Sequence, residues 1–301
     1  ATNTAGSLRI GTGSEIVTAV KTRREIIVLT DTSVHSMQFI GPPFTFGINQ
    51  LASNITVRGF NTAVAVGDAI FWMGYDRFYI YDGRVQVIPC SVRDHVFQDF
   101  NETQSDKVYA GVNSAFGEVF WFYPSETNSG ANGGTDENDK YVVYNYDQKI
   151  WYVGSLARTS WVDRGVYQYP MATDSNLVYN HEKGNDNDGT AFTSFIESSP
   201  IDVQDGDQFV FLRRMIPDIS FENSDSNISN DNKQAVLSLK AQRSPNGGFV
   251  KTSTNTVTST TELNHLRLRG RSFGLRVEST TQGVNWRLGT QRVDLRADGD
   301  R

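Results

Sequence analysis

Hydrophobic and polar residues along Asp68–Asn101 predict a compact unit of three antiparallel strands followed by a helix. Two apolar runs, Ala69–Met73 and Phe78–Tyr81, are separated by turn residues. Asp82-Gly83, flanked by alternating apolar and polar residues, is a strong hairpin signal and leads into a third strand. The helix is expected near 91–100, directly after a proline.

The predicted helix carries a recognisable start signal. Ser91 is placed to cap it, and Asp94 stands three residues later, as in a capping box. Val92, Val96 and Phe100 recur at helical spacing and indicate one apolar face.

Versions of this unit recur on both sides of it, which favours an all-β fold. Aromatic-rich strands lie near Ile27, Phe71, Phe120 and Val142, at an irregular spacing of roughly 20 to 50 residues, close to the period of propeller blades. These are too few blades to close a ring. We therefore expect a partial or complete β-propeller-like domain, or sheets that pack as a sandwich, in a chain that is a fragment or a processed product.

From about Ala191 the strands become longer and alternate strictly, which is typical of a β-sandwich of the jelly-roll kind. The predicted organisation is therefore a blade-like domain over 1–185, with its one short helix, and a β-sandwich over 190–301. Between two blade-like strands, Ser125–Asp139 contains only turn formers, acids and small residues, so it is predicted to be a mobile, solvated loop.

Charge and cysteine content exclude several classes of protein. A net charge of −6 argues against a general nucleic-acid binder but allows a local basic surface. The single cysteine, Cys90, excludes an intrachain disulfide framework and is expected to be a buried apolar residue. No apolar run is long enough to span a membrane, and no signal peptide is recognised.

Signals for catalysis, cofactors or metals are weak. The four histidines lie far apart, without metal-ligand spacing, at His35, His95, His181 and His265. No nucleophile elbow and no phosphate-binding glycine loop is present. Asn185–Gly189 resembles half of a calcium loop but lacks the closing glutamate, so a polar interdomain turn is favoured over a weak ion site. We therefore predict no catalytic residue, no cofactor and no metal.

The most unusual feature is a series of arginines near the end of the chain, namely Arg267, Arg269, Arg271, Arg276, Arg287, Arg292 and Arg296. Residues two apart in a strand share a face, so the first three should point the same way. One interpretation is a solvated outer face balanced by acids on neighbouring strands. The other is a basic surface that contacts an acidic partner subunit or DNA phosphates, because the arginine fork binds both.

Four stretches of the chain, 69–101, 141–165, 169–185 and 266–296, resemble tail hub, or nozzle, proteins of short-tailed bacteriophages, also called packaged-DNA stabilisation proteins. The resemblance covers about 25–296, although this chain is shorter than the family pattern. It implies a propeller-like body with a β-sandwich appendage and no catalytic residues. It also implies a homo-oligomeric, typically hexameric ring in the virion tail, assembled in the host cytoplasm. Such a ring lies below the portal and adaptor, extends the DNA channel and helps retain the genome. The acidic loop 125–139 and the arginine face are candidates for its two complementary surfaces.

Two other functions remain open at this point. A tail-associated glycan-degrading enzyme would need paired carboxylates, and no two in the sequence are recognisably paired. A glycan-binding β-sandwich would need an exposed aromatic platform, such as Trp161 or Trp286, although a tryptophan in an alternating strand is more often part of a core.

Overall fold

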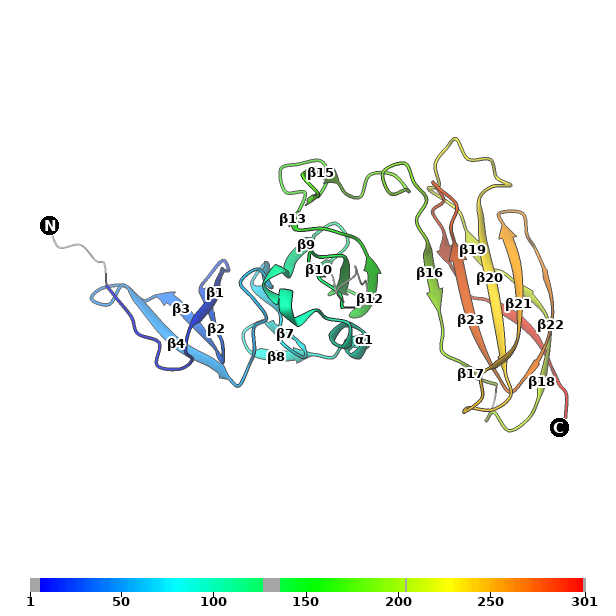
Figure 1. The fold of residues 1–301 in the computed structure, drawn as a ribbon, viewed down its shortest axis with the longest axis horizontal. Coiled ribbons are helices and arrows are strands. Elements are labelled where there is room, and N and C mark those ends of the chain that lie inside the picture. The colour runs from blue at the N-terminus through cyan, green and yellow to red at the C-terminus, as the bar shows by residue number, and fades with distance from the viewer. Residues whose placement is uncertain (1–5, 127–135, 204, 300–301) are drawn as a thin grey trace. The chain divides into compact units, whose positions relative to one another are not determined.

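The computed structural model describes residues 6–126, 136–203 and 205–299, which form two compact units, 1–182 and 183–301 (Figure 1). Both units are built from antiparallel strands joined by turns and loops, and the helical content of the described residues is confined to α1 (Arg93–Gln98) and the short 3-10 helix η1 (Glu102–Lys107). The predicted all-β class is confirmed, and no closed barrel occurs among the described residues.

The first unit consists of four sheets, each an antiparallel meander in chain order. Sheet 1 contains β1 (Ile16–Lys21), β2 (Ile26–Thr30), β3 (Ser33–Phe39) and β4 (Phe46–Ser53). Sheet 2 contains β5 (Ala63–Val66), β6 (Ala69–Met73), β7 (Phe78–Tyr81) and β8 (Val85–Ile88). Sheet 3 contains β9 (Tyr109–Asn113), β10 (Glu118–Tyr123), β11 (Lys140–Asn145) and β12 (Ile150–Ser155), and sheet 4 contains β13 (Ser160–Val162), β14 (Met171–Asp174) and β15 (Leu177–Asn180).

These sheets pack face to face in chain order, because the central strands of sheets 2 and 3 are apolar on both faces. In sheet 2, Ile70 and Trp72 face sheet 1, whereas Phe71 and Met73 face sheet 3. Phe120 and its neighbours on sheet 3 meet sheet 4 in the same way. Sheets 2 and 3 are therefore covered on both sides, as central sheets of a stack must be.

The first strands of consecutive sheets are neighbours: β1 contacts β5, β5 contacts β9, and β9 contacts β13. Together they line a groove of about 670 Å³, whose walls include Lys21, Asn61, Tyr109 and Asp163. The order of sheets and the shared position of their first strands support the propeller-like interpretation, since inner strands of blades surround a central channel.

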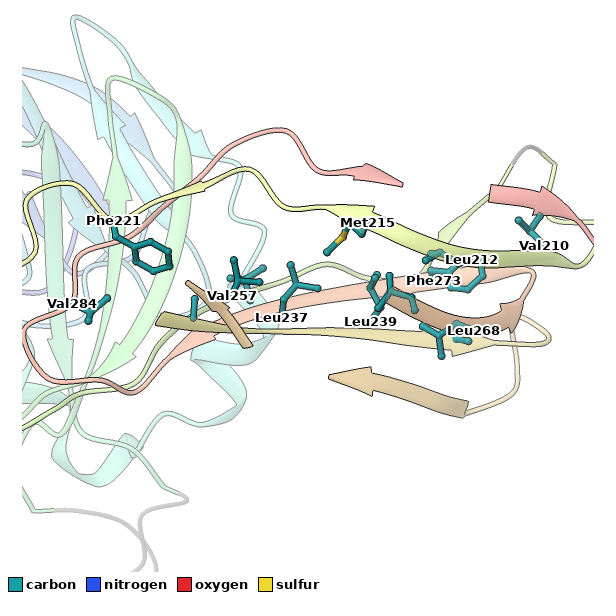
Figure 2. Close-up of a cluster of buried hydrophobic side chains, with 14 residues drawn as sticks. Val210, Leu212, Met215, Phe221, Leu237, Leu239, Val257, Leu268, Phe273 and Val284 are labelled. Carbon is teal, nitrogen blue, oxygen red and sulfur yellow. The ribbon is translucent and has the colours of Figure 1, made fainter. Parts of the chain in front are cut away.

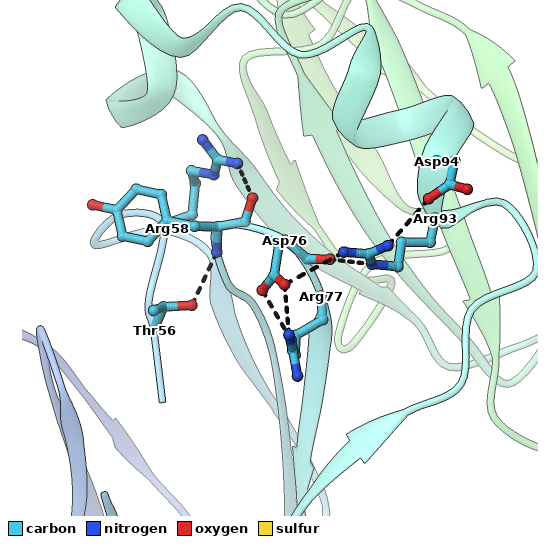
Figure 3. Close-up of polar contacts among 7 residues, drawn as sticks. Thr56, Arg58, Asp76, Arg77, Arg93 and Asp94 are labelled. Atoms are coloured by element: carbon cyan, nitrogen blue, oxygen red, sulfur yellow. Dashed lines mark hydrogen bonds and ion pairs between the residues drawn. The ribbon is translucent and has the colours of Figure 1, made fainter. Parts of the chain in front are cut away.

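The turn after β6 is tied to helix α1 by charge (Figure 3). The Asp76 carboxylate accepts hydrogen bonds from Arg77 at 2.6 and 2.9 Å and from Arg93, on the helix, at 3.4 Å. Nearby, the fully buried Arg58 side chain donates to the Tyr75 carbonyl and to Glu102. Its guanidinium also lies 4.0 Å from the centre of the Phe100 ring.

The helix itself differs from the prediction at its start. Val92 is the N-cap residue, and no side chain caps the helix, so Ser91 and Asp94 do not form the expected capping box. The apolar face is nevertheless present, since Val96 and Phe100 are buried in the core between sheets 2 and 3.

In the second unit, a larger sheet has the order β16 (Ser194–Glu197), β23 (Ser272–Ser279), β20 (Gln234–Gln242), β21 (Phe249–Thr258), with β17 (Ile201–Asp202) also paired to β23. A smaller sheet has the order β22 (Asn264–Gly270), β18 (Val210–Ile216), β25 (Arg292–Ala297), and β19 (Ile219–Ser220) pairs with β24 (Arg287–Leu288). Leu212 and Leu268 from the smaller sheet meet Leu237 and Leu239 from the larger one in a single core (Figure 2). Two sheets around one apolar core support the sandwich interpretation.

One local prediction was wrong, and another concerns residues that lie partly outside the described ones. The apolar pattern of the three strands within 68–101 predicts a buried Val87, but this residue is 48% exposed because β8 is the outermost strand of sheet 2. Residues 127–135 of the predicted mobile loop lie outside the described residues. The ends of that loop are fixed: Ser125 donates to Asp139 at 2.7 Å, and buried Asn138 donates to the Lys107 carbonyl at 2.8 Å.

Candidate functional site: a basic sheet face

The outer face of the smaller sheet in the second unit gathers arginines from three strands. On β22, Leu266 and Leu268 are buried and Arg267 and Arg269 point away from the core, as alternation predicts. Cross-strand register places Phe211 beside Arg269 on one side and beside Arg296 on the other. Arg296 on β25 therefore lies on the same face of the sheet as Arg269 on β22.

A shift in register adds two further arginines to this face. Between Leu212 and Arg214, the pairing of β18 slips by one residue against both neighbouring strands. Leu212 and Met215 are both buried, so the two residues between them, Arg213 and Arg214, are both exposed. A bulge re-aims side chains in this way because the extra residue breaks strict alternation.

Aspartates neutralise only part of the face. Arg214 pairs with Asp294 at 3.0 Å, Arg292 lies 3.9 Å from Asp218, and Arg269 pairs with Asp298. Three other arginines of this face are exposed and form no ion pair with any described residue, namely Arg213, Arg267 and Arg296. The face therefore has an excess of positive charge.

Arg269 and Arg271 are held together by one aromatic ring. The guanidinium carbons lie 4.1 and 4.8 Å from the centre of the Phe209 ring, which is itself buried. Arg271 follows the last residue of β22, yet this shared ring keeps it next to Arg269. Cation–π contacts of this kind fix the direction of a guanidinium group without removing its charge.

The remaining predicted arginines lie elsewhere. Arg276 is on β23 of the larger sheet, where it pairs with Glu197 at 2.8 Å and with Glu278. Hydrogen bonds to these two carboxylates raise the pKa of Arg276, and its charge is balanced locally. Arg287 is on β24, outside the basic sheet. The structure thus brings together Arg267, Arg269, Arg271 and Arg292, and separates them from Arg276 and Arg287.

Sequence reasoning missed Arg213 and Arg214. Both stand in a strand that the sequence predicts, but strict alternation assigns consecutive residues to opposite faces. Only the register shift shows that both are exposed, and it depends on strands about 50 and 80 positions away in the sequence.

Two of the four histidines and the half calcium loop have structural partners, and the cysteine is half-buried, whereas His95 and His265 are exposed. His35 is buried against Thr12 Oγ1 at 3.0 Å. Burial and the Arg158 charge lower the pKa of His181 to about 4, and its Nε2 accepts a hydrogen bond from Arg158 at 2.8 Å. Burial raises the pKa of Cys90 to about 11. Asn185 donates to Asp225 at 2.8 Å, and no group of three or more metal-ligating side chains occurs among the described residues.

Two carboxyl groups lie close together at one end of sheet 3, a feature that the sequence did not reveal. Glu118 accepts a hydrogen bond from Tyr152 at 2.7 Å, and Glu182 accepts one at 3.0 Å from buried Asn113, the cross-strand neighbour of Glu118. Burial raises the pKa of Glu118, and the charge of Glu182 raises it further. Loss of hydration raises the pKa of Glu182 as well, although the residue as a whole is exposed.

Neither tryptophan considered as a sugar platform is exposed. Trp161 is 5% exposed and packs on Phe120, with ring centres 5.1 Å apart. Trp286 is partly buried against the core of the second unit and donates to Ser194 Oγ at 2.8 Å.

Comparisons with known proteins identify no family for this chain. No family model and no curated protein matches the sequence. One solved structure, named glycoside hydrolase, aligns with this chain at 10% sequence identity and a TM-score of 0.26. The alignment covers 89% of this chain and 82% of the other chain. A TM-score this low does not establish a shared fold. None of the helices among the described residues is long and apolar enough to cross a membrane.

Proposed function

We propose that this chain is a structural protein of the tail of a short-tailed phage, a hub or nozzle subunit. In this role it forms a ring of copies below the portal and adaptor, extends the DNA channel and helps retain the packaged genome. It acts in the virion and performs no catalysis. The resemblance of the four sequence stretches and the rigid, aromatic-packed sheets support this proposal.

The observation that carries the proposal is the basic face of the second unit. DNA phosphates repeat along the duplex and require a surface of several exposed cations, without base-specific contacts. Arg213, Arg267 and Arg296 supply cations without an aspartate partner, and Phe209 orients two more guanidinium groups. A chain with a net charge of −6 concentrates positive charge here, which favours a specific role for this face over general binding.

The test is binding of the purified chain to random-sequence duplex DNA at several salt concentrations. Each phosphate contact contributes about 0.9 to the slope of log affinity against log salt. Replacing Arg213, Arg267 and Arg296 together with glutamine should weaken binding and reduce the slope by about 0.9 for each phosphate that is no longer neutralised. Arg276→Gln is the matched control, because its charge is balanced on the other sheet, and it should leave the slope unchanged.

Wild-type protein that shows no salt-dependent binding to DNA would contradict this role of the face. Binding to an acidic polypeptide in place of DNA would assign the face to a protein partner. Gold-labelled antibodies against the chain should decorate the tails of virions of the encoding phage. Decoration of the capsid, or none, would contradict the location.

A second candidate, a tail-associated glycan-degrading protein, is favoured by one observation, the neighbouring carboxyl groups of Glu118 and Glu182. Glycoside hydrolysis uses two carboxyl groups, one of them with a raised pKa. Here Glu118 accepts a hydrogen bond from Tyr152, and Glu182 accepts one from Asn113. These hydrogen bonds are sufficient to give both carboxyl groups a structural role. Release of sugar from host polysaccharide that is abolished by Glu118→Gln would establish this candidate. It would also exclude a purely structural role for the chain.

A further inference from the structure

The stack of sheets in the first unit ends in two faces that no other sheet among the described residues covers. The segment around Thr12 covers the outer face of sheet 1 at Ser33 and His35, and the rest of that face is open. Sheets 2 and 3 have a neighbour on both sides, but sheets 1 and 4 use only one face for the internal contacts. Both opposite faces carry exposed apolar side chains. Apolar side chains that gather on one exposed face are typical of contact surfaces, unlike apolar side chains that are exposed singly.

On sheet 4, the covered and open faces follow from strand alternation. Trp161 and Ala172 face sheet 3 and are buried. Val162 and Val178 stand on the opposite face, with exposed fractions of 50% and 67%. Met171, paired with Val162, lies between these strands on the same face. Each of the three strands therefore contributes one apolar side chain to the open face of sheet 4, beside the polar residues Ser160, Thr173 and Asn180.

On sheet 1, Val34 faces sheet 2, so the alternate residues of β3 face outward. Phe39 and Phe46 are cross-strand partners on this outer face, with ring centres 5.9 Å apart, and are 70% and 44% exposed. Met37 and Ile48 form the next pair on the same face and are half-buried. Four apolar side chains thus form one outward-facing patch, most exposed at its two phenylalanines.

We propose that the open face of sheet 4 packs on the open face of sheet 1 of a second copy of this chain. The contact would continue the internal series, in which every sheet packs on the next through apolar residues of its central strands. Both surfaces occur on one chain, and no other sheet in the described part of that chain covers the apolar part of either. Each copy can therefore cover the open face of the next.

Such a contact is heterologous, because it joins two different surfaces. Heterologous contacts produce a ring when the rotation closes and a filament when it does not. The closure into a ring rests on the proposed function, whereas the pairing of the two faces does not. The inference gives the proposed ring a defined interface in the first unit, separate from the basic face of the second unit.

The test uses one charged substitution on each face, measured by light scattering after size-exclusion chromatography over a range of concentrations. Wild-type protein should self-associate. Phe46→Lys on sheet 1 and Val178→Lys on sheet 4 should each yield monomers, because a lysine would be buried without a partner in the contact. Val87→Lys is the matched control: this residue is 48% exposed on sheet 2, away from both faces, and its variant should associate like wild type.

Mixing the two monomeric variants is the decisive step. Phe46→Lys retains an intact sheet 4 face and Val178→Lys an intact sheet 1 face, so an equimolar mixture should form heterodimers and no larger species. A symmetric contact would give no heterodimer and would overturn the proposal. Wild-type protein that stays monomeric, or association that survives both substitutions, would also overturn it.

Phe39→Gln provides a second variant of the sheet 1 face, milder than lysine, and should weaken association without abolishing it. Circular dichroism of each variant verifies that the sheets are formed. DNA binding by monomeric variants tests the proposed function independently, so the two proposals can fail separately.

Discussion

The indole ring of Trp161 lies directly against the backbone of Gly111. A Cβ atom built on Gly111 would come within 2.5 Å of Trp161 Cδ1, and the indole Nε1 donates to the carbonyl of the adjacent Val112 at 2.8 Å. This contact joins sheet 3 to sheet 4, and only glycine leaves room for it.

Gly111→Ala should therefore destabilise the first unit by about 1–3 kcal/mol, the usual cost of overpacking a core. Tryptophan fluorescence during urea unfolding measures this, because four of the five tryptophans, all but Trp286, lie in the first unit. Gly248→Ala is the control, since nothing lies within 4 Å of its added Cβ. Equal urea midpoints for Gly111→Ala and Gly248→Ala would show that sheets 3 and 4 can move apart around the added methyl group at little cost in stability.

Arg58 is held by hydrogen bonds and aromatic rings at once, which lysine cannot reproduce. Its planar fork donates to the Tyr75 carbonyl and to Glu102 while stacking on Phe100. Arg58→Lys should lose one charged hydrogen bond and the stacking, at a cost on the order of 1.5–3 kcal/mol. Thermal unfolding of the first unit provides the measurement, and an unchanged midpoint would show that the fork is not needed.

Strand positions with strong alternation or continuous apolar runs could be predicted from the sequence. The bounds of β6 and β7 agree with the predicted runs Ala69–Met73 and Phe78–Tyr81. β5 was missed because its Ala-Val-Ala-Val run is short, and β21 because it is mostly polar. The apolar and aromatic residues of Val166–Tyr169 also favour a strand, but they form none, since β14 begins after Pro170. Ala172 on β14 is buried beside its cross-strand partner Trp161.

The candidate site could be predicted where it depends on one strand and not where it depends on several. Alternation alone placed Arg267 and Arg269 on one face. The contribution of Arg213 and Arg296 depends on which strands are neighbours and on the register between them. These are long-range properties, and no local pattern in the sequence determines them.

Glu118 should make the stability of the first unit fall as pH rises. Burial raises its folded-state pKa, so the stability it contributes is fully present below about pH 4.5, the ordinary value, and is lost as pH rises through the folded value. Glu118→Gln keeps an acceptor for Tyr152 but cannot ionise. The variant should therefore equal or exceed the wild type in stability at pH 7 and show a weaker loss above pH 4.5.

Glu25 provides the control of opposite sign. Burial opposes its ionisation, but hydrogen bonds from Ser36, Tyr81 and Gln38 together outweigh burial and lower its pKa. Its contribution is present above about pH 4.5 and is lost as pH falls through the folded value. Glu25→Gln should therefore lower stability at pH 7. Chemical unfolding at a series of pH values tests both variants, and parallel pH profiles would refute the assignment.

Phe209 should affect DNA binding differently from the arginines that it orients. Its ring faces both Arg269 and Arg271 and contributes about 0.5–1 kcal/mol for each partly exposed cation–π contact. Phe209→Leu removes that orientation while every charge remains. Affinity for duplex DNA should fall about two- to five-fold for each arginine that binds a phosphate, and the salt slope should stay at the wild-type value because the number of phosphate contacts is unchanged. The arginine variants, in contrast, reduce the slope.

A Phe209→Leu protein with a reduced slope would mean that the ring is needed for the arginines to reach the phosphates at all. One with wild-type affinity would mean that Arg269 and Arg271 point away from the DNA.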